Sequence, residues 1–135
     1  MYDMGEPVLV AILFADRVIE EANHKKGIIG TFSRFYADTF PASFPPWFIY
    51  AAVTNLQGEC AFSVNLVYEK AQQVILPISG KFTVDNFRSV VELIFPVFRA
   101  VFPEEGVYTL TFNIDGEPVG SRLLEVFKRP DKPPQ

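Results

Sequence analysis

The chain has 135 residues, a formal net charge of −4 and a single cysteine. This length is typical of one domain that can bury a stable core without cross-links. The mildly acidic balance argues against a nucleic-acid partner, because proteins that bind phosphate backbones gather lysine and arginine on one face.

Aromatic residues make up 15% of the chain, and 11 prolines and 8 glycines are spread along it. Aromatic side chains favour strands, and regularly spaced turn residues are typical of many short strands. We therefore expect an all-β protein. In chain order, the expected strands are Val8–Ala15, Ile28–Tyr36, Trp47–Thr54, Glu59–Tyr68, Val74–Ile78, Lys81–Val84, Phe87–Phe102, Val107–Ile114 and Val119–Phe127.

The first half of the chain predicts strands joined by exposed turns. Val8–Ala15 is a nearly continuous apolar run, which fits a strand buried on both faces, with a short helix as the alternative. The polar stretch Glu20–Gly27 predicts an exposed turn or hairpin loop. Gly30 within the next strand indicates a bulge or a close backbone approach. We expect Trp47–Thr54 and Glu59–Tyr68 to pair as a hairpin.

Prolines shape the expected middle of the chain. Ala37–Pro46 contains three prolines and should be irregular, with Phe40 and Phe44 packing against the sheet. Pro77 predicts an edge strand or a strand end, because proline cannot donate to a sheet ladder, and Ser79-Gly80 should interrupt the strand that follows. Residues 87–102 read as a strand, with a short helix as the alternative.

The clearest local signal is a hairpin between Glu104 and Phe127. Apolar and polar residues alternate up to Ile114, and Asp115-Gly116 follows, which favours a two-residue turn with positive φ at both positions. Pro118 then requires a sheet edge or a bulge. Counted away from the turn, the expected pairs are Ile114–Glu117, Asn113–Pro118, Phe112–Val119 and Tyr108–Leu123.

Eight or nine short strands without a long amphipathic helix predict an antiparallel β-sandwich of the immunoglobulin-like or C2-like kind. We expect a single domain over residues 1–127. Residues 128–135 are charged, rich in proline and free of apolar side chains, so they predict a disordered tail.

The residues that usually carry chemistry do not form a set. His24 lies in a polar turn, and Cys60 lies on the apolar face of an alternating strand, where it reads as a small buried hydrophobe. Four aspartates near strand ends lack the spacing of a calcium-binding loop and carry no metal prediction, namely Asp16, Asp38, Asp85 and Asp115. We therefore expect no enzyme, no cofactor and no metal.

The candidate binding surface comprises Asp16, Arg17, Arg34, Phe44, Trp47 and Tyr50. Asp16-Arg17 breaks a long apolar run, so the two residues either close a strand end as an ion pair or line a surface together with Arg34. The three rings lie near the loop Pro41–Trp47 and either stack on a sugar or small ligand or pack in the core.

Several segments resemble a family of small bacterial proteins that is classed only as a domain of unknown function. They are Ala11–Val18, Lys26–Phe32, Phe40-Pro41, Gly106–Tyr108 and Ile114–Gly116. The resemblance spans most of the chain and implies an all-β domain and a bacterial source. It implies no activity, cofactor or catalytic residue.

These observations favour a non-enzymatic protein-interaction or accessory domain, with a small-ligand or carbohydrate-binding module as the alternative. The acidic start Met1–Glu6 lacks the basic region of a signal peptide, and Pro7–Ala15 is too short to cross a membrane, so we expect a cytoplasmic protein with no membrane partner. The strand Ile28–Tyr36 has no proline and one charge, which predicts a homodimer or another protein complex through a sheet edge or face.

Overall fold

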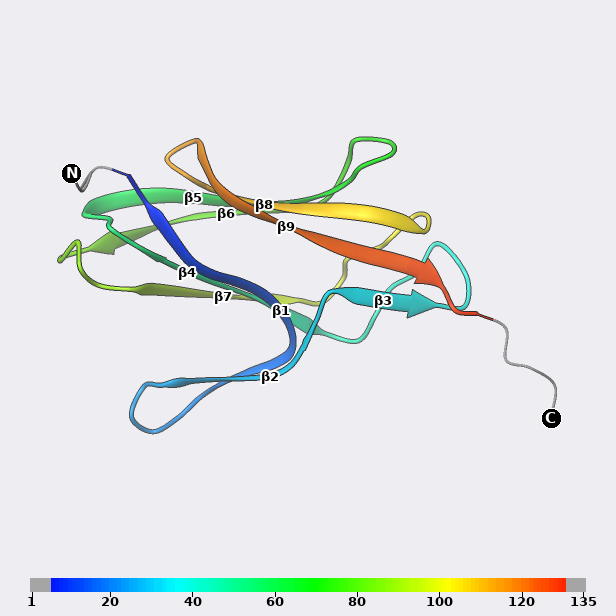
Figure 1. Cartoon of the computed structure of the whole chain (residues 1–135), viewed down its shortest axis with the longest axis horizontal. Coiled ribbons are helices and arrows are strands. Elements are labelled where there is room, and N and C mark those ends of the chain that lie inside the picture. The colour runs from blue at the N-terminus through cyan, green and yellow to red at the C-terminus, as the bar shows by residue number, and fades with distance from the viewer. Residues whose placement is uncertain (1–5, 131–135) are drawn as a thin grey trace.

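The structure is a computed structural model that describes residues 6–130, and within them nine strands form two packed sheets (Figure 1). The strands are β1 (Val8–Glu20), β2 (Lys26–Phe32), β3 (Arg34–Ala37), β4 (Trp47–Thr54), β5 (Gly58–Tyr68), β6 (Gln73–Val84), β7 (Val91–Val97), β8 (Gly106–Ile114) and β9 (Glu117–Lys128). Sheet A has the order β2-β1-β4-β7, and sheet B has the order β3-β9-β8-β5-β6. The predicted all-β sandwich is confirmed.

The order of the strands is that of an immunoglobulin-like sandwich. The chain crosses between the sheets after β2, β3, β4, β6 and β7, and only the pairs β1/β2, β5/β6 and β8/β9 are consecutive strands within one sheet. In the immunoglobulin arrangement, strands A, B and E share one sheet while C′, C, F and G share the other. Here β1, β4 and β7 take the first set of positions, and β6, β5, β8 and β9 take the second. Among the described strands only β3 pairs in parallel, with the end of β9.

A tyrosine at the start of β8 supports this assignment. Tyr108 is fully buried and donates its hydroxyl to the carbonyl oxygen of Glu104, four residues earlier, at 2.5 Å. This is the tyrosine corner of immunoglobulin-like domains, which ties the turn before strand F to the core. Tyr68 stacks on Tyr108 at 4.8 Å between ring centroids, and its hydroxyl donates to the Glu104 carboxylate.

We expect Tyr108→Phe to lower the free energy of unfolding by about 0.5–1.5 kcal/mol at neutral pH, because the hydrogen bond from the buried hydroxyl to the Glu104 carbonyl is lost. Burial raises the pKa of Tyr108 to about 12, and burial raises the pKa of Tyr50 to about 12 as well. Tyrosine in the unfolded chain titrates near pH 10. The unfolded chain therefore releases these protons first, so stability is complete below about pH 10 and falls as pH rises toward 12.

Denaturant titrations at pH 8 and at pH 11 measure both effects. The substituted protein should lose less stability between the two pH values than the wild type does, with Tyr50 and Tyr68, whose pKa values are also raised by burial, supplying the remaining loss. Tyr36→Phe is the matched control, since Tyr36 is 44% exposed. An equal alkaline loss in wild type and Tyr108→Phe would contradict the assignment of the effect to the corner.

A continuous cluster of aromatic rings fills one end of the core. Its members are Phe14, Phe32, Phe35, Phe44, Trp47, Phe102, Tyr108 and Tyr68. Phe44 stacks on Phe35 at 4.0 Å, and two backbone hydrogen bonds join Ala42 to Phe102. The predicted packing of the proline-containing loop against the sheet is confirmed, and the loop is held in place by its own rings.

The predicted hairpin between β4 and β5 is wrong. β4 pairs with β1 and β7 in sheet A, whereas β5 pairs with β6 and β8 in sheet B. The residues between these two strands carry the chain from one sheet to the other. Alternation identifies the core-facing side of β5, and β4 is buried on both faces, but alternation does not identify the neighbour to which a strand bonds.

The expected interruption at Ser79-Gly80 is also absent, because β6 runs without a break from Gln73 to Val84. The ring of Phe62 lies against Gly80 on the paired strand, where a Cβ would collide with it. Glycine at this position therefore makes room for a ring and does not end the strand. Pro77 does lie in an edge strand, as predicted.

The predicted strand Ile28–Tyr36 is two strands that belong to different sheets. β2 ends at Phe32, and β3 begins at Arg34 beside β9. Gly30 has a φ of 72°, and a Cβ there would collide with the Asp16 carboxylate, which confirms the close approach. Further along the chain, Phe87–Phe102 contains the strand β7 and no helix, with Pro96 in an edge strand.

The hairpin of β8 and β9 confirms the first two predicted pairs and shifts the others. Asp115 and Gly116 have φ values of 49° and 82°, and Ile114–Glu117 and Asn113–Pro118 face each other. A bulge follows at once, so Phe112 faces Gly120 and Tyr108 faces Leu124, one residue beyond the expected partners. The bulge lies beside Pro118, where proline predicted an edge or a bulge.

Strand β9 continues through Lys128, one residue past the expected end of the domain. The backbone N–H of Lys128 donates to the Glu105 carboxylate at 2.9 Å, and that of Arg129 donates to the carbonyl of Ala37 at 2.8 Å. Residues 128 and 129 are therefore tied to the sandwich. Most of the predicted disordered tail, residues 131–135, lies outside the described residues.

Candidate interaction surfaces

The structure does not bring the predicted surface residues together. Asp16 and Arg17 are exposed within β1, which continues to Glu20, so they do not end a strand. Among the described residues no ion pair joins Asp16 to Arg17. Arg34 lies on β3, where its guanidinium bonds the Glu125 carboxylate of β9 at 3.0 Å.

The predicted stacking platform near the proline loop is wrong, because its rings are packed. Trp47 is 2% exposed and contacts Phe14 and Phe35 within the core. Phe44 lies face to face with Phe35. Tyr50 is buried on the outer side of β4 and donates its hydroxyl to Glu92. Trp47 and Tyr50 are therefore buried, and Phe44 is half-buried with one face covered by Phe35.

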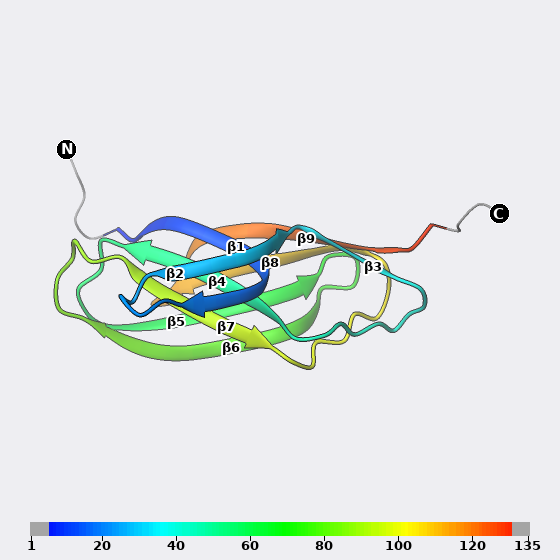
Figure 2. The same cartoon turned by 90° about the horizontal axis from the view of Figure 1, so that it is seen from below.

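The first half of β1 takes the position of strand A. The second half of β1 and β2 form an additional hairpin, which precedes the short strand β3 that pairs with β9. In Figures 1 and 2 the outer part of this hairpin lies over the outer side of sheet A, across β4 and β7. Lys26 anchors it, with its ammonium 3.4 Å from Glu20 and 4.0 Å from Glu92 on β7. His24 at the tip has a side chain that is 88% exposed, as expected for a loop histidine.

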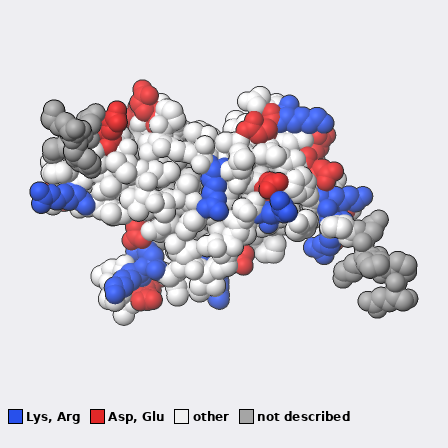
Figure 3. Space-filling view, viewed as in Figure 1, with Lys and Arg blue, Asp and Glu red and all other residues white. Residues whose placement is uncertain are grey.

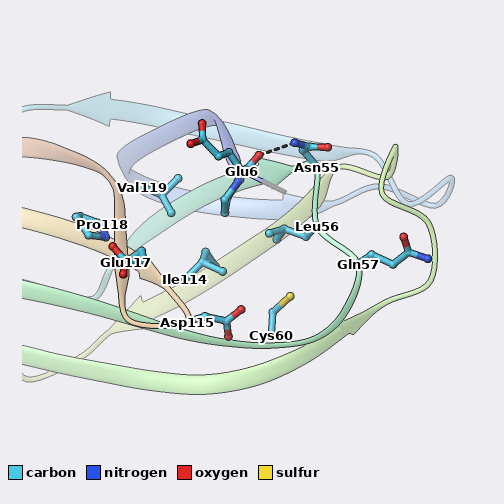
Figure 4. A pocket seen from close by; sticks show the side chains of 11 residues that line it. Glu6, Asn55, Leu56, Gln57, Cys60, Ile114, Asp115, Glu117, Pro118 and Val119 are labelled. Carbon is cyan, nitrogen blue, oxygen red and sulfur yellow. Dashed lines mark hydrogen bonds between the residues drawn. The ribbon is translucent and has the colours of Figure 1, made fainter. Parts of the chain in front are cut away.

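A recess of about 690 Å³ opens at the end of the sandwich where the β4–β5 loop and the β8–β9 turn meet (Figure 4). Asn55, Leu56 and Gln57 lie on one side of it, and Glu117, Pro118 and Val119 lie on the other. Local sequence patterns did not indicate this recess, because its two walls come from loops of different sheets. Only the strand order places them side by side.

Two polar contacts hold the walls of the recess in place. Asn55, which is 2% exposed, donates its side-chain amide to the carbonyl of Glu6. The Asp115 carboxylate accepts the N–H of Ala61 at 2.9 Å, while the Asp115 N–H donates to the Ala61 carbonyl at 2.7 Å. Asp115 therefore links the hairpin turn to β5 and has a structural role.

Cys60 lines the recess but is not activated. Its side chain is 3% exposed, and burial, followed by the nearby Asp115 carboxylate, raises the pKa of the thiol. A raised pKa leaves the thiol protonated at neutral pH, whereas a nucleophile or metal ligand needs the thiolate. Within residues 6–130, no cluster of three or more histidine, cysteine, aspartate or glutamate side chains could hold a metal ion.

We expect Cys60 to react with a thiol reagent only slowly in the native protein at neutral pH, because it is both buried and protonated. Labelling followed by absorbance should become complete only in denaturant. Glu59→Cys in a Cys60→Ala background is the matched control, since the Glu59 side chain is 70% exposed, and it should react at once. Fast native labelling of Cys60 itself would contradict this account.

The β1/β9 flank is defined by the uncovered strand edges Val8–Leu13 of β1 and Val119–Leu124 of β9. β2 pairs with β1 only from Phe14 onward, and β3 pairs with β9 only from Glu125 onward. Both edges therefore lie open beside each other. Figure 1 shows β1 and β9 crossing this side of the sandwich, and Figure 3 shows this side mostly uncharged, with a lysine or arginine side chain near its middle.

Both strands of this flank carry exposed apolar side chains. Val8, Val10 and Leu123 are 44%, 54% and 55% exposed. One contact bridges the two strands: Arg122 of β9 donates to the carbonyl oxygen of Ile12 at 2.7 Å. Scattered apolar residues are ordinary on a surface, but a patch next to unpaired backbone groups is typical of an interaction site.

The other open edges carry features that discourage pairing. β6 has Pro77 and Lys81, and β7 has Pro96 and Glu92. β2 is kinked at Gly30 and carries Lys26, while β3 has only four residues. Proteins use proline, charge, irregular backbone and short length in this way to keep edges from aggregating. Val8–Leu13 has neither proline nor charge, and its protection comes from a bulge between Leu9 and Ala11 and from Arg122 of the neighbouring strand, which bonds the Ile12 carbonyl.

The sequence of residues 10–127 matches a family of unknown function, DUF6941. The chain belongs to this family. The match confirms the resemblance to a domain of unknown function and covers all but the last residue of β9 and most of the open edge of β1. No match was found among curated proteins. In the described part of the chain, no helix has the length and apolar character needed to cross a membrane.

Proposed function

We propose that this protein is a non-enzymatic protein-interaction domain that binds a protein partner through the β1/β9 flank. The observation that carries the proposal is the open, uncharged edge of Val8–Leu13 beside exposed Val10 and Leu123. Strand addition at such an edge supplies main-chain hydrogen bonds, and the alternate side chains supply specificity.

The state of the candidate chemical groups supports a binding role over a catalytic one. The only histidine lies at the tip of an exposed hairpin and bonds Glu20, far along the chain from the recess residues. The only cysteine is buried and protonated. A binding domain needs neither group, whereas hydrolysis by a nucleophile needs a base within hydrogen-bond reach.

We further propose a bacterial, cytoplasmic protein. The single cysteine fits a reducing compartment, where structural disulfides are rare. The acidic balance and the paired lysine and arginine side chains favour a protein partner over a nucleic acid. Arg34 and Lys81, for instance, are each bonded to a glutamate on the neighbouring strand.

A photo-crosslinking amino acid placed at position 10 tests the proposal in living cells. Val10 is 54% exposed, so the substitution leaves the core untouched. Irradiation should yield covalent adducts with protein. Position 74 on β6 is the matched control, because Val74 is 53% exposed on an edge strand with proline, and it should give none.

A second measurement keeps the test specific to the flank. A crosslinker at position 123 should form the same adduct, and Val10→Lys should remove that adduct by placing a charge on the edge. Absence of protein adducts from positions 10 and 123, or equal adducts from position 74, would contradict the proposal.

A further inference from the structure

We infer that the occupant of the β1/β9 flank is the same flank of a second copy, so that two chains pair antiparallel through β1 about a two-fold axis. This inference rests on the proposed function and names its partner. It replaces the expected contact through Ile28–Tyr36, whose strand divides between two sheets and is kinked at Gly30.

The two strands of the flank point the same way. The Leu9 side chain packs where Gly120 lacks one, and three residues further along β1 the Ile12 carbonyl accepts from Arg122. Residue numbers therefore rise together along both strands. Glu117 lies toward one end of the flank, and Arg122 lies toward the other.

A two-fold axis near Val10 and Gly120 makes the β1 and β9 strands of the second copy run opposite to those of the first. The Glu117 end of one chain then faces the Arg122 end of the other, because an isologous interface brings residue i to j and j to i. Opposite charges meet at both ends of the interface, and the uncharged edge Val8–Leu13 meets itself. Such complementarity favours the correct register.

Arg122 has a different partner in the two states. In the single chain its guanidinium bonds the Ile12 carbonyl, with its central carbon 5.5 Å from the centre of the Phe14 ring. In the pair it turns to Glu117 of the partner subunit, and the Ile12 carbonyl becomes free for the ladder between the two β1 strands. Arg122 thus covers the edge of the monomer and stabilises the dimer.

The pairing buries the side chains that the single chain leaves exposed. Val8 and Val10 lie on the open edge of β1 in each copy, and both are exposed. Val8–Leu13 brings no like charges opposite each other when it pairs with itself, which would be unfavourable at directly facing positions. A stable interface of this kind buries at least roughly 1,000 Å² in total.

Sedimentation velocity from low to high micromolar concentration tests the inference. Wild type should reach twice the mass of the chain. Val10→Lys should sediment as a monomer, and Val74→Lys, an equally exposed substitution on β6, should remain a dimer. Glu117→Lys should raise the dissociation constant at least about tenfold, which corresponds to 1.4 kcal/mol. Circular dichroism checks that each variant is folded.

Disulfide trapping adds a position-specific readout. Val10→Cys should form a linked dimer under mild oxidation, because position 10 lies next to its own copy across the axis, whereas Val74→Cys should not. A wild-type monomer at every concentration, or a dimer that Val10→Lys leaves intact, would overturn the inference. If Val10 crosslinks to a different protein while the purified chain is monomeric, the inference fails and the proposed function stands.

Discussion

Replacing Phe102 by alanine is expected to lower the free energy of unfolding by about 3–5 kcal/mol. Phe102 has no exposed surface, and its ring lies edge-on to Phe44 and Tyr108 at centroid distances of 5.5 and 5.0 Å. Its backbone also pairs with Ala42. The substitution opens a cavity between the proline-containing loop and the tyrosine corner, and the loss is large beside a total stability of about 5–15 kcal/mol.

Phe98→Ala is the matched control for this experiment. Phe98 lies four residues earlier in the same connection and is 64% exposed, so its removal should change stability by less than about 0.5 kcal/mol. Chemical denaturation of both variants and the wild type measures the difference. Similar losses from the two substitutions would show that the ring cluster does not anchor the loop as described.

Asp115→Ala should destabilise the protein by about 2–4 kcal/mol, somewhat less than the sum of the two effects below, because Asp115 is exposed and its charge is screened. The carboxylate that accepts the Ala61 N–H is lost, and a charged acceptor contributes about 1.5–3 kcal/mol. Alanine must also adopt the φ of 49° that the turn requires, and the left-handed region costs an ordinary residue about 1–2 kcal/mol. The turn joins β8 to β9 and bonds to β5, so the damage extends to three strands of sheet B.

Two further substitutions separate these effects. Asp115→Gly removes the acceptor, but glycine adopts a positive φ without strain, so this variant should lose less stability than Asp115→Ala. Asp115→Asn keeps an oxygen acceptor and tolerates positive φ, and it should cost least. Thermal or denaturant unfolding of the three variants should give the order alanine, glycine, asparagine, from most to least destabilised. Equal stability of the Asp115→Gly and Asp115→Ala variants would show that the backbone conformation of the turn does not contribute to the loss.

The hairpin of β1 and β2 distinguishes this sandwich from a plain immunoglobulin-like domain. An isolated two-stranded hairpin is marginally stable in water, so this one depends on contacts with the sheet below it. Lys26, whose side chain is 17% exposed, reaches Glu92 and thereby joins the hairpin to β7. Within this hairpin β2 pairs only with the second half of β1, from Phe14 onward, so the edge of Val8–Leu13 is left unpaired.

Local patterns in the sequence determined the strands and their turns. Trp47–Thr54 matches β4 at both ends, and Asp115-Gly116 predicted the turn and its first two residue pairs, because alternation and positive-φ residues act within a few positions. The same reasoning identified an edge or bulge at Pro118, since the missing N–H is a property of that residue alone. The class of fold followed from the number and spacing of such segments.

Tertiary structure alone decided which strands became neighbours and which residues became surface. Nothing local separates β4 from β5 into different sheets, because each strand presents an apolar face to the core and either neighbour could pair with its backbone. Packing against Leu9 favours glycine at position 120, and the bulge before it moves Tyr108 opposite Leu124. Tertiary packing also covered the rings of Phe44, Trp47 and Tyr50. The candidate flank arose where β2 and β3 stop short of Val8–Leu13 and Val119–Leu124. The length over which two strands pair depends on the whole path of the chain.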